Sequence, residues 1–166
     1  MNKIYAGIGS RETPEWAIGT MKRLGVYFAS SGYVLRSGGA TGADSAFESG
    51  CDEANGKKEI YLPWQNFENN KSDLFRLSEC AVQLASEFHP HWNKCSSGAR
   101  KMHSRNCYQV LGIDLETPAD FIICWTKGTG GTEQALRIAK FFNIPIFNLY
   151  EYMWKIELEE FLFGGE

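Results

Sequence analysis

Short apolar runs alternate with amphipathic stretches along this chain. Apolar runs of strand length occupy residues 3–8, 33–35, 58–63, 118–125 and 145–148. Between them, apolar residues recur at the three- and four-residue spacing of a helix face. This spacing predicts six helices, which cover residues 13–32, 43–54, 71–88, 98–112, 132–142 and 150–163.

Local signals mark several of these boundaries. Thr13 is expected to cap the first helix, with Pro14 in its first turn and Glu15 facing the positive end of the helix dipole. Gly32 is expected to stop this helix. The His89-Pro90-His91 stretch is expected to break the helix over residues 71–88.

Strands that are apolar throughout and alternate with helices indicate a parallel sheet covered on both faces. The sequence therefore predicts an α/β protein, a three-layer Rossmann-like fold with a mostly parallel sheet and helices on both faces. It shows no internal repeat, linker or low-complexity tract, so residues 1–166 are expected to form a single domain.

Composition narrows the functional class. No apolar run approaches the roughly 20 residues of a membrane span, and the first residues lack the long apolar stretch of a signal peptide. The five cysteines include no Cys-x-x-Cys pair, which favours reduced thiols and a cytoplasmic protein without membrane contact. The net charge of −3 is unlike the basic surplus usual for nucleic-acid binding.

Three junctions between a strand and a helix are rich in glycine, serine and threonine. They are residues 7–11 (the first loop), residues 37–42 (the second loop) and residues 128–132 (the third loop). In a parallel sheet these loops meet at the carboxyl edge, and each precedes a helix whose first amides lack intrahelical partners. We expect them to cradle a phosphate, although any one of them alone is equally well explained as a tight turn.

His89, His91, Cys95 and His103 are close in sequence and are of metal-ligating types. Their spacing fits no common zinc pattern, so the sequence predicts no metal site, and no cofactor is implied. Trp64 and Trp92 fall in predicted loops. They are candidates for stacking on a base, or alternatively for covering a core.

The order of the polar motifs resembles a known superfamily. The motifs are Gly-Ser-Arg at 9–11, Ser-Gly-Gly-Ala-Thr-Gly-Ala-Asp at 37–44, Ser-Arg-Asn at 104–106 and Gly-Thr-Gly-Gly-Thr at 128–132. Together they are similar to the Rossmann-like domain of DNA recombination-mediator protein A. The same (SLOG-type) superfamily includes the Lonely Guy phosphoribohydrolases and nucleotide-sensing domains of bacterial defence proteins, and the resemblance covers residues 3–149.

The resemblance implies a nucleotide or phosphorylated nucleoside as ligand. The phosphoribohydrolases carry a catalytic glutamate where this sequence has Ala135, and a lysine where it has Asn106. Glu133 or Asp44 would have to substitute in an N-glycosidase, with Arg105 matching the family arginine. The recombination mediator binds single-stranded DNA, a third possibility for this chain.

We therefore expect a nucleotide-binding sensor or sequestering protein. The alternatives are a nucleoside monophosphate N-glycosidase and a protein that binds single-stranded DNA in recombination. Relatives commonly self-associate, so a homodimer is expected. The candidate catalytic residues are Glu133, Asp44 and Arg105. The candidate ligand-binding residues are Gly9, Ser10, Arg11, Ser37, Gly38, Gly39, Thr41, Arg105, Asn106, Gly128, Thr129, Gly130, Gly131 and Thr132.

Overall fold

The computed structural model describes residues 2–165 and contains one parallel sheet. The five strands lie in the order β3-β2-β1-β4-β5. The chain adds β2 and β3 on one side of β1 and then β4 and β5 on the other, so the strand order reverses between β1 and β4. Ligands of open α/β sheets bind beside such a reversal. The strands are β1 (Ile4–Gly7), β2 (Val34–Ser37), β3 (Lys58–Ile60), β4 (Phe121–Cys124) and β5 (Ile146–Asn148).

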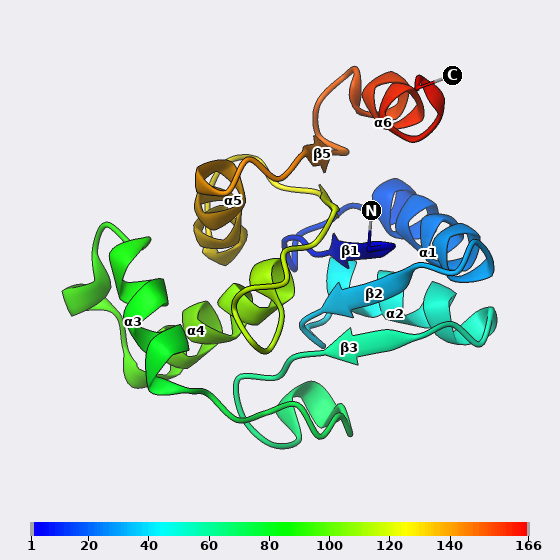
Figure 1. Cartoon of the computed structure of the whole chain (residues 1–166). Coiled ribbons are helices and arrows are strands. Elements are labelled where there is room, and N and C mark those ends of the chain that lie inside the picture. The colour runs from blue at the N-terminus through cyan, green and yellow to red at the C-terminus, as the bar shows by residue number, and fades with distance from the viewer. Residues whose placement is uncertain (1, 166) are drawn as a thin grey trace.

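Helices cover both faces of this sheet. In Figure 1, α1 and α2 lie on one side of the strands and α3, α4 and α5 on the other. The predicted three-layer α/β architecture is thereby confirmed. The helices are α1 (Glu15–Ser30), α2 (Ala43–Glu53), α3 (Glu79–Glu87), α4 (Ser97–Leu111), α5 (Gly131–Phe141) and α6 (Trp154–Phe163), with short 3-10 turns η1 (Phe67–Asn69) and η2 (Trp92–Lys94).

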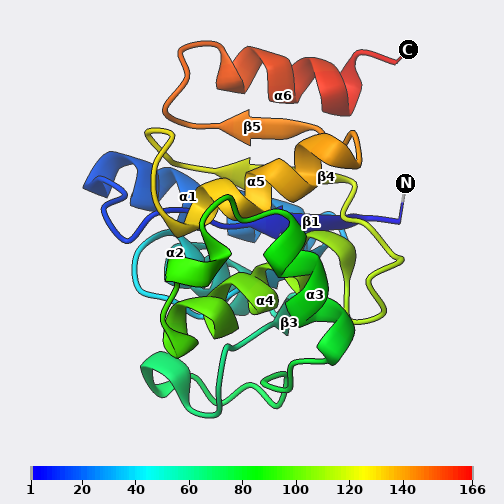
Figure 2. The same ribbon diagram turned by 90° about the vertical axis from the view of Figure 1, so that its left-hand side faces the viewer.

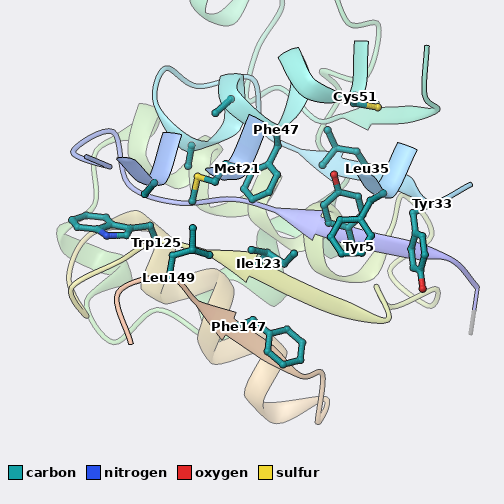
Figure 3. Close-up of a cluster of buried hydrophobic side chains, with 14 of the residues drawn as sticks. Tyr5, Met21, Tyr33, Leu35, Phe47, Cys51, Ile123, Trp125, Phe147 and Leu149 are labelled. Carbon is teal, nitrogen blue, oxygen red and sulfur yellow. The ribbon is translucent and has the colours of Figure 1, made fainter. Parts of the chain in front are cut away.

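The face toward α1 and α2 holds an aromatic core. Tyr5 of β1 is paired in register with Phe121 of β4, and their rings stack with centroids 5.8 Å apart. Phe28 of α1 packs against the same tyrosine ring at 4.8 Å. Figure 3 shows the side chain of Phe47 in the same cluster. These aromatic side chains form the core on this face, whereas other aromatic residues, such as Phe141 and Tyr152, are exposed.

The opposite face is aliphatic. Ala6 follows Tyr5 and points the other way, as successive strand residues do, toward α4 and α5. There it joins Ile122 of β4, Val110 of α4 and Ile138 of α5, all fully buried. The small and branched side chains let α4 and α5 lie close to the sheet.

The last helix closes the edge of the sheet. Figure 2 shows α6 lying along β5, and Leu158 of α6 is buried against the aromatic core. This helix begins at Trp154, four residues later than predicted, because residues 149–153 form a turn. Across the described residues, no helix combines the length and the apolar character needed to cross a membrane.

The helix predicted over residues 71–88 begins only at Glu79. Residues 71–78 are instead irregular, and Leu74 forms an isolated bridge with Tyr61 just beyond β3. The amide of Leu62 donates to the carbonyl of Leu74 at 2.8 Å, and the Ser72 hydroxyl donates to the carbonyl of Ile60. Ser78 then caps α3 by accepting from the amide of Ala81 at 3.1 Å.

The predicted capping role of Thr13 is also wrong. Helix α1 begins at Glu15 after Pro14, and the Thr13 hydroxyl donates to the carbonyl of Ser10 instead. Because proline carries no amide hydrogen, the entry to this helix has one fewer donor to satisfy. The predicted stop is confirmed, since α1 ends at Ser30 and Gly32 has a φ of +81°.

Helices α1 and α2 touch through glycine, which generates a testable prediction. A Cβ on Gly50 would collide with the backbone carbonyl of Lys22. We expect Gly50→Ala to lower the free energy of unfolding by about 1–3 kcal/mol, the usual cost of overpacking. The matched control is Gly19→Ala, whose Cβ meets only the Arg23 side chain at 3.5 Å.

The control should be neutral or up to about 1 kcal/mol more stable, because alanine favours helix. Urea unfolding followed by circular dichroism measures both variants. Equal effects of the two substitutions would contradict the close approach of α1 and α2.

Candidate functional site

A crevice of about 820 Å³ opens at the carboxyl edge of the sheet, beside the reversal between β1 and β4. All three glycine-rich loops border this edge, as their placement after parallel strands predicts. The first and third loops, the start of α2, one side of α4 and the segment from His89 to His91 form its walls. What each loop offers a ligand depends on where its backbone amides already donate.

Several amides in and just after the first loop donate within the protein. The amides of Ile8 and Ser10 donate to the carbonyls of Ile123 and Trp125, each at 3.1 Å. Directly after the loop, the amides of Glu12 and Thr13 donate to Ser10. The contribution of this loop that we consider further is the Arg11 side chain, which lines the crevice.

The second loop is filled by the protein's own side chains. A Cβ on Gly38 would collide with Gln109, Arg105 and Asp44. The Asp44 carboxylate accepts from the amide of Ala40 at 3.2 Å. An internal carboxylate thus lies where the sequence pattern predicts an external phosphate, and the glycine makes room for side chains rather than for a ligand.

Arg105 holds this arrangement from within. Its guanidinium donates to the carbonyls of Gly38 and Tyr61 and to the Asn106 side chain, and only 6% of its surface is exposed. Burial raises the pKa of Asp44 to about 6, although the charge of Arg105 acts in the opposite direction. Burial also lowers the pKa of Arg105. Arg105 borders the crevice, and its Nε and one terminal nitrogen, Nη1, already donate inside the protein.

The third loop is open. A Cβ added to Gly128, Gly130 or Gly131 would meet no atom within 4 Å. The amides of Gly131 and Thr132 belong to the first turn of α5, where helical amides lack intrahelical partners and the dipole is positive. Asn106 fixes the loop by donating to the carbonyl of Gly131 at 3.2 Å. This is the geometry of an anion cradle.

An exposed cation, Arg11 of the first loop, also lines the crevice. Arg11 forms an ion pair with Glu68 at 2.9 Å, and its side chain is 55% exposed. An exposed pair of this kind contributes little to stability. Arg11 is therefore free to exchange its partner for the negative charge of a ligand.

The structure divides the predicted site residues into two groups. Those that line the crevice are Gly9, Ser10, Arg11, Asp44, Arg105, Asn106, Thr129, Gly130, Gly131 and Thr132. Those outside its lining are Ser37, Gly38, Gly39, Thr41, Gly128 and Glu133.

Glu133 is turned toward Thr126, whose hydroxyl lies 3.4 Å from its carboxylate. Gln109 lines the crevice and was not predicted. It lies one helical turn after Arg105, and this spacing is the signal that would have found it. Trp64 and Trp92 are outside the lining, and Trp64 packs edge-on against Phe67.

Three of the four metal-ligating residues come together beside the crevice. The ligand atoms of His89, Cys95 and His103 all lie within 4.8 Å of one another, whereas His91 is not part of the group. Burial, followed by the charges of His89 and Arg137, lowers the pKa of His103 to about 4. Its imidazole is therefore neutral at pH 7.

Comparisons with known proteins give a likeness in structure only. No protein-family model matches the chain, and neither does any curated protein sequence. The Moco carrier protein of Chlamydomonas reinhardtii is 18% identical with a TM-score of 0.54, over 98% of this chain and 84% of its own. DNA processing protein A from Helicobacter pylori is 19% identical with a TM-score of 0.56, over 96% and 73%.

This chain has their fold. At such low identities the likeness reaches no further than the architecture, and it confirms the Rossmann-like fold that the sequence motifs imply. Both proteins are described by what they bind, a molybdenum cofactor in one case and single-stranded DNA in the other.

The raised pKa of Asp44 generates a prediction about pH and stability. Between its unfolded pKa of 3.8 and its folded pKa of about 6, the unfolded chain loses this proton while the folded chain keeps it. Stability from this group is therefore lost as the pH rises from about 4 to about 6, by up to about 3 kcal/mol. Asp44→Asn should not show this loss.

We expect the stability of Asp44→Asn relative to the natural chain to increase between pH 4 and pH 7. Urea unfolding of both proteins at several pH values measures the difference between their free energies of unfolding. The contributions of the other carboxyl groups are the same in both proteins and cancel in this difference. A difference that stays constant with pH would show that the pKa of Asp44 is not raised.

Proposed function

We propose that this protein binds a small phosphorylated ligand of the nucleotide class in the crevice, with a phosphate on the third loop. The observation that carries the proposal is the start of α5, where Gly130, Gly131 and Thr132 line the crevice and a Cβ on either glycine would meet no atom within 4 Å. Arg11 supplies a side-chain cation at the same opening. Amides at a helix start and an arginine are common partners of phosphate.

The size and lining of the crevice support a ligand larger than inorganic phosphate. Its volume of about 820 Å³ falls in the range of small-molecule sites, roughly 300–1,000 Å³. Ile8, Met102 and Ala135 provide apolar wall beside the polar third loop. A nucleoside would place its base against apolar wall and its phosphate on the amides.

A sensing or sequestering role is favoured over catalysis. Ala135 occupies the position of the family glutamate, and Glu133 points toward Thr126 rather than into the crevice. A Moco carrier protein among the structural neighbours shows that this fold serves proteins described as carriers.

One observation favours a hydrolase as the second candidate. The Asp44 carboxyl borders the crevice, and its pKa of about 6 would let it donate a proton near neutral pH. In an N-glycosidase, the departing base would take that proton while water attacks the ribose. Release of free base from nucleoside monophosphates would establish this activity, and its absence at high protein concentration would exclude it.

Single-stranded DNA remains a predicted partner because the structurally similar DNA processing protein A binds it. The net charge of −3 counts against strong backbone binding. Fluorescence anisotropy of a labelled oligonucleotide, repeated at rising salt, separates this function from nucleotide binding. The homodimer and the cytoplasmic location are likewise still predictions.

The proposal predicts thermal stabilisation by one class of compound. In a panel of nucleoside mono- and diphosphates, cyclic nucleotides and ADP-ribose, the binding ligand at a hundredfold its Kd should add about 2.7 kcal/mol to the free energy of unfolding. Gly131→Val should abolish this shift, because its side chain occupies the open space over the α5 amides. The protein itself has room for that side chain.

The matched control is Gly98→Val on α4, a glycine with open surroundings outside the crevice lining. Arg11→Ala should weaken binding about tenfold or more, as loss of a charge-assisted hydrogen bond does. A ligand shift that survives Gly131→Val would place the phosphate elsewhere. No shift with any compound in the panel would contradict the proposed ligand class.

A further inference from the structure

Three segments of the chain converge on one cluster beside the crevice. His89 follows the end of α3, Cys95 follows η2 and His103 belongs to α4. The Cys95 sulfur lies 3.7 Å from each ring nitrogen of His89. The rings of His89 and His103 have centroids 4.4 Å apart. Two imidazoles and a thiol thus share one small volume.

His103 has a buried polar atom without a partner. No hydrogen bond within the described residues reaches its Nδ1, although water has no access to this atom. An unsatisfied buried nitrogen costs about 1–3 kcal/mol, and natural proteins rarely leave one without an ion or a water molecule. This nitrogen is one of only three described buried side-chain atoms in that condition.

Outside the cluster, the side chains of the other two members make one local hydrogen bond each. The Cys95 thiol donates to the carbonyl of His91 at 3.6 Å, and His89 Nδ1 accepts from the amide of His91 at 3.1 Å. Both contacts are to His91, which is exposed. Breaking these two hydrogen bonds to bind a stronger partner would therefore cost little free energy.

We propose that His89, Cys95 and His103 bind a divalent ion of the Zn²⁺ class. Zinc takes nitrogen at about 2.0–2.1 Å and thiolate sulfur at about 2.3 Å, so tetrahedral ligands of these types lie about 3.6 Å apart. The observed separation of 3.7 Å between Cys95 and His89 matches this value, and the third ligand atom lies within 4.8 Å of both. On binding, the thiol proton passes to solvent as the zinc–sulfur bond forms.

The site supplies three protein ligands and leaves the fourth position open. His89 and His103 line the crevice and Cys95 lines a neighbouring pocket, so the cluster lies in the wall of the crevice. Three protein ligands with an exchangeable fourth are typical of zinc that meets a substrate or an anion. Binding of the ion itself does not depend on the proposed nucleotide function.

The test uses the full chain with Zn²⁺ or Co²⁺ alone. We expect one equivalent of Zn²⁺ to bind, measured by competition with a chromophoric chelator. Co²⁺ should give a thiolate-to-metal charge-transfer band and the strong visible bands of tetrahedral coordination. Cys95→Ser should remove the charge-transfer band. His103→Gln should weaken Zn²⁺ binding at least about tenfold, because loss of a residue that only hydrogen-bonds to a metal ligand already costs about that much.

Two matched variants control for adventitious binding. Cys80→Ser removes an exposed thiol outside the cluster, and His91→Gln removes a neighbouring imidazole. Both should bind Zn²⁺ and Co²⁺ like the natural chain. Absence of stoichiometric binding, or a cobalt spectrum without thiolate character, would overturn the proposal. So would loss of binding in Cys80→Ser together with its retention in Cys95→Ser.

Should a ligand variant fail to fold, the cobalt spectrum of the natural chain still decides the matter. Repeating the nucleotide panel with a chelator present separates the two proposals. If nucleotides still stabilise the protein in the presence of chelator, nucleotide binding does not require the metal. If Zn²⁺ binds but no nucleotide stabilises the protein, the metal site is supported and the proposed function is not.

Discussion

The buried guanidinium of Arg105 ties together the elements that border the crevice. It donates to the carbonyl of Gly38 after β2 and to that of Tyr61 after β3, and it orients the adjacent Asn106. Asn106 in turn donates to Gly131 at the start of α5. A buried arginine needs this many partners because leaving its donors unpaired would be costly. The same partners set the spacing of the loops at the carboxyl edge.

This internal arginine explains why similar loops differ in what they offer. Arg105 attracts the Asp44 carboxylate, which occupies the second loop and uses its amide at Ala40. After the third loop the acid of the first turn of α5, Glu133, is turned toward Thr126, and a Cβ on the loop's glycines would meet no atom within 4 Å. One glycine-rich turn therefore serves packing while another remains available to a ligand. The composition of the two turns is alike, and only their neighbours distinguish them.

The sequence predicted what depends on local periodicity and missed what depends on distant partners. The buried strands and five of the six helices follow from apolar spacing. The structure of residues 71–78 does not follow from this spacing, because Leu74 and Leu77 fit a helix face as well as an extended segment. The hydrogen bond from the Leu62 amide to the Leu74 carbonyl favours the extended form. The filling of the second loop depends on Arg105, 67 residues further along the chain. The sequence did show four metal-ligating residue types close together, but their spacing fits no common zinc pattern, and the fold brings only His89, Cys95 and His103 into one group.

One turn of α4 contacts three walls of the crevice. His103 faces the cluster with His89, Arg105 reaches the ends of β2 and β3, and Asn106 holds the start of α5. The three side chains reach three different parts of the chain, so each wall is anchored to the same helix. A displacement at any one of these walls must then either move α4 or break its contact with α4. Through α4, the third loop is connected to the cluster of His89, Cys95 and His103. The sequence pattern alone does not indicate this connection.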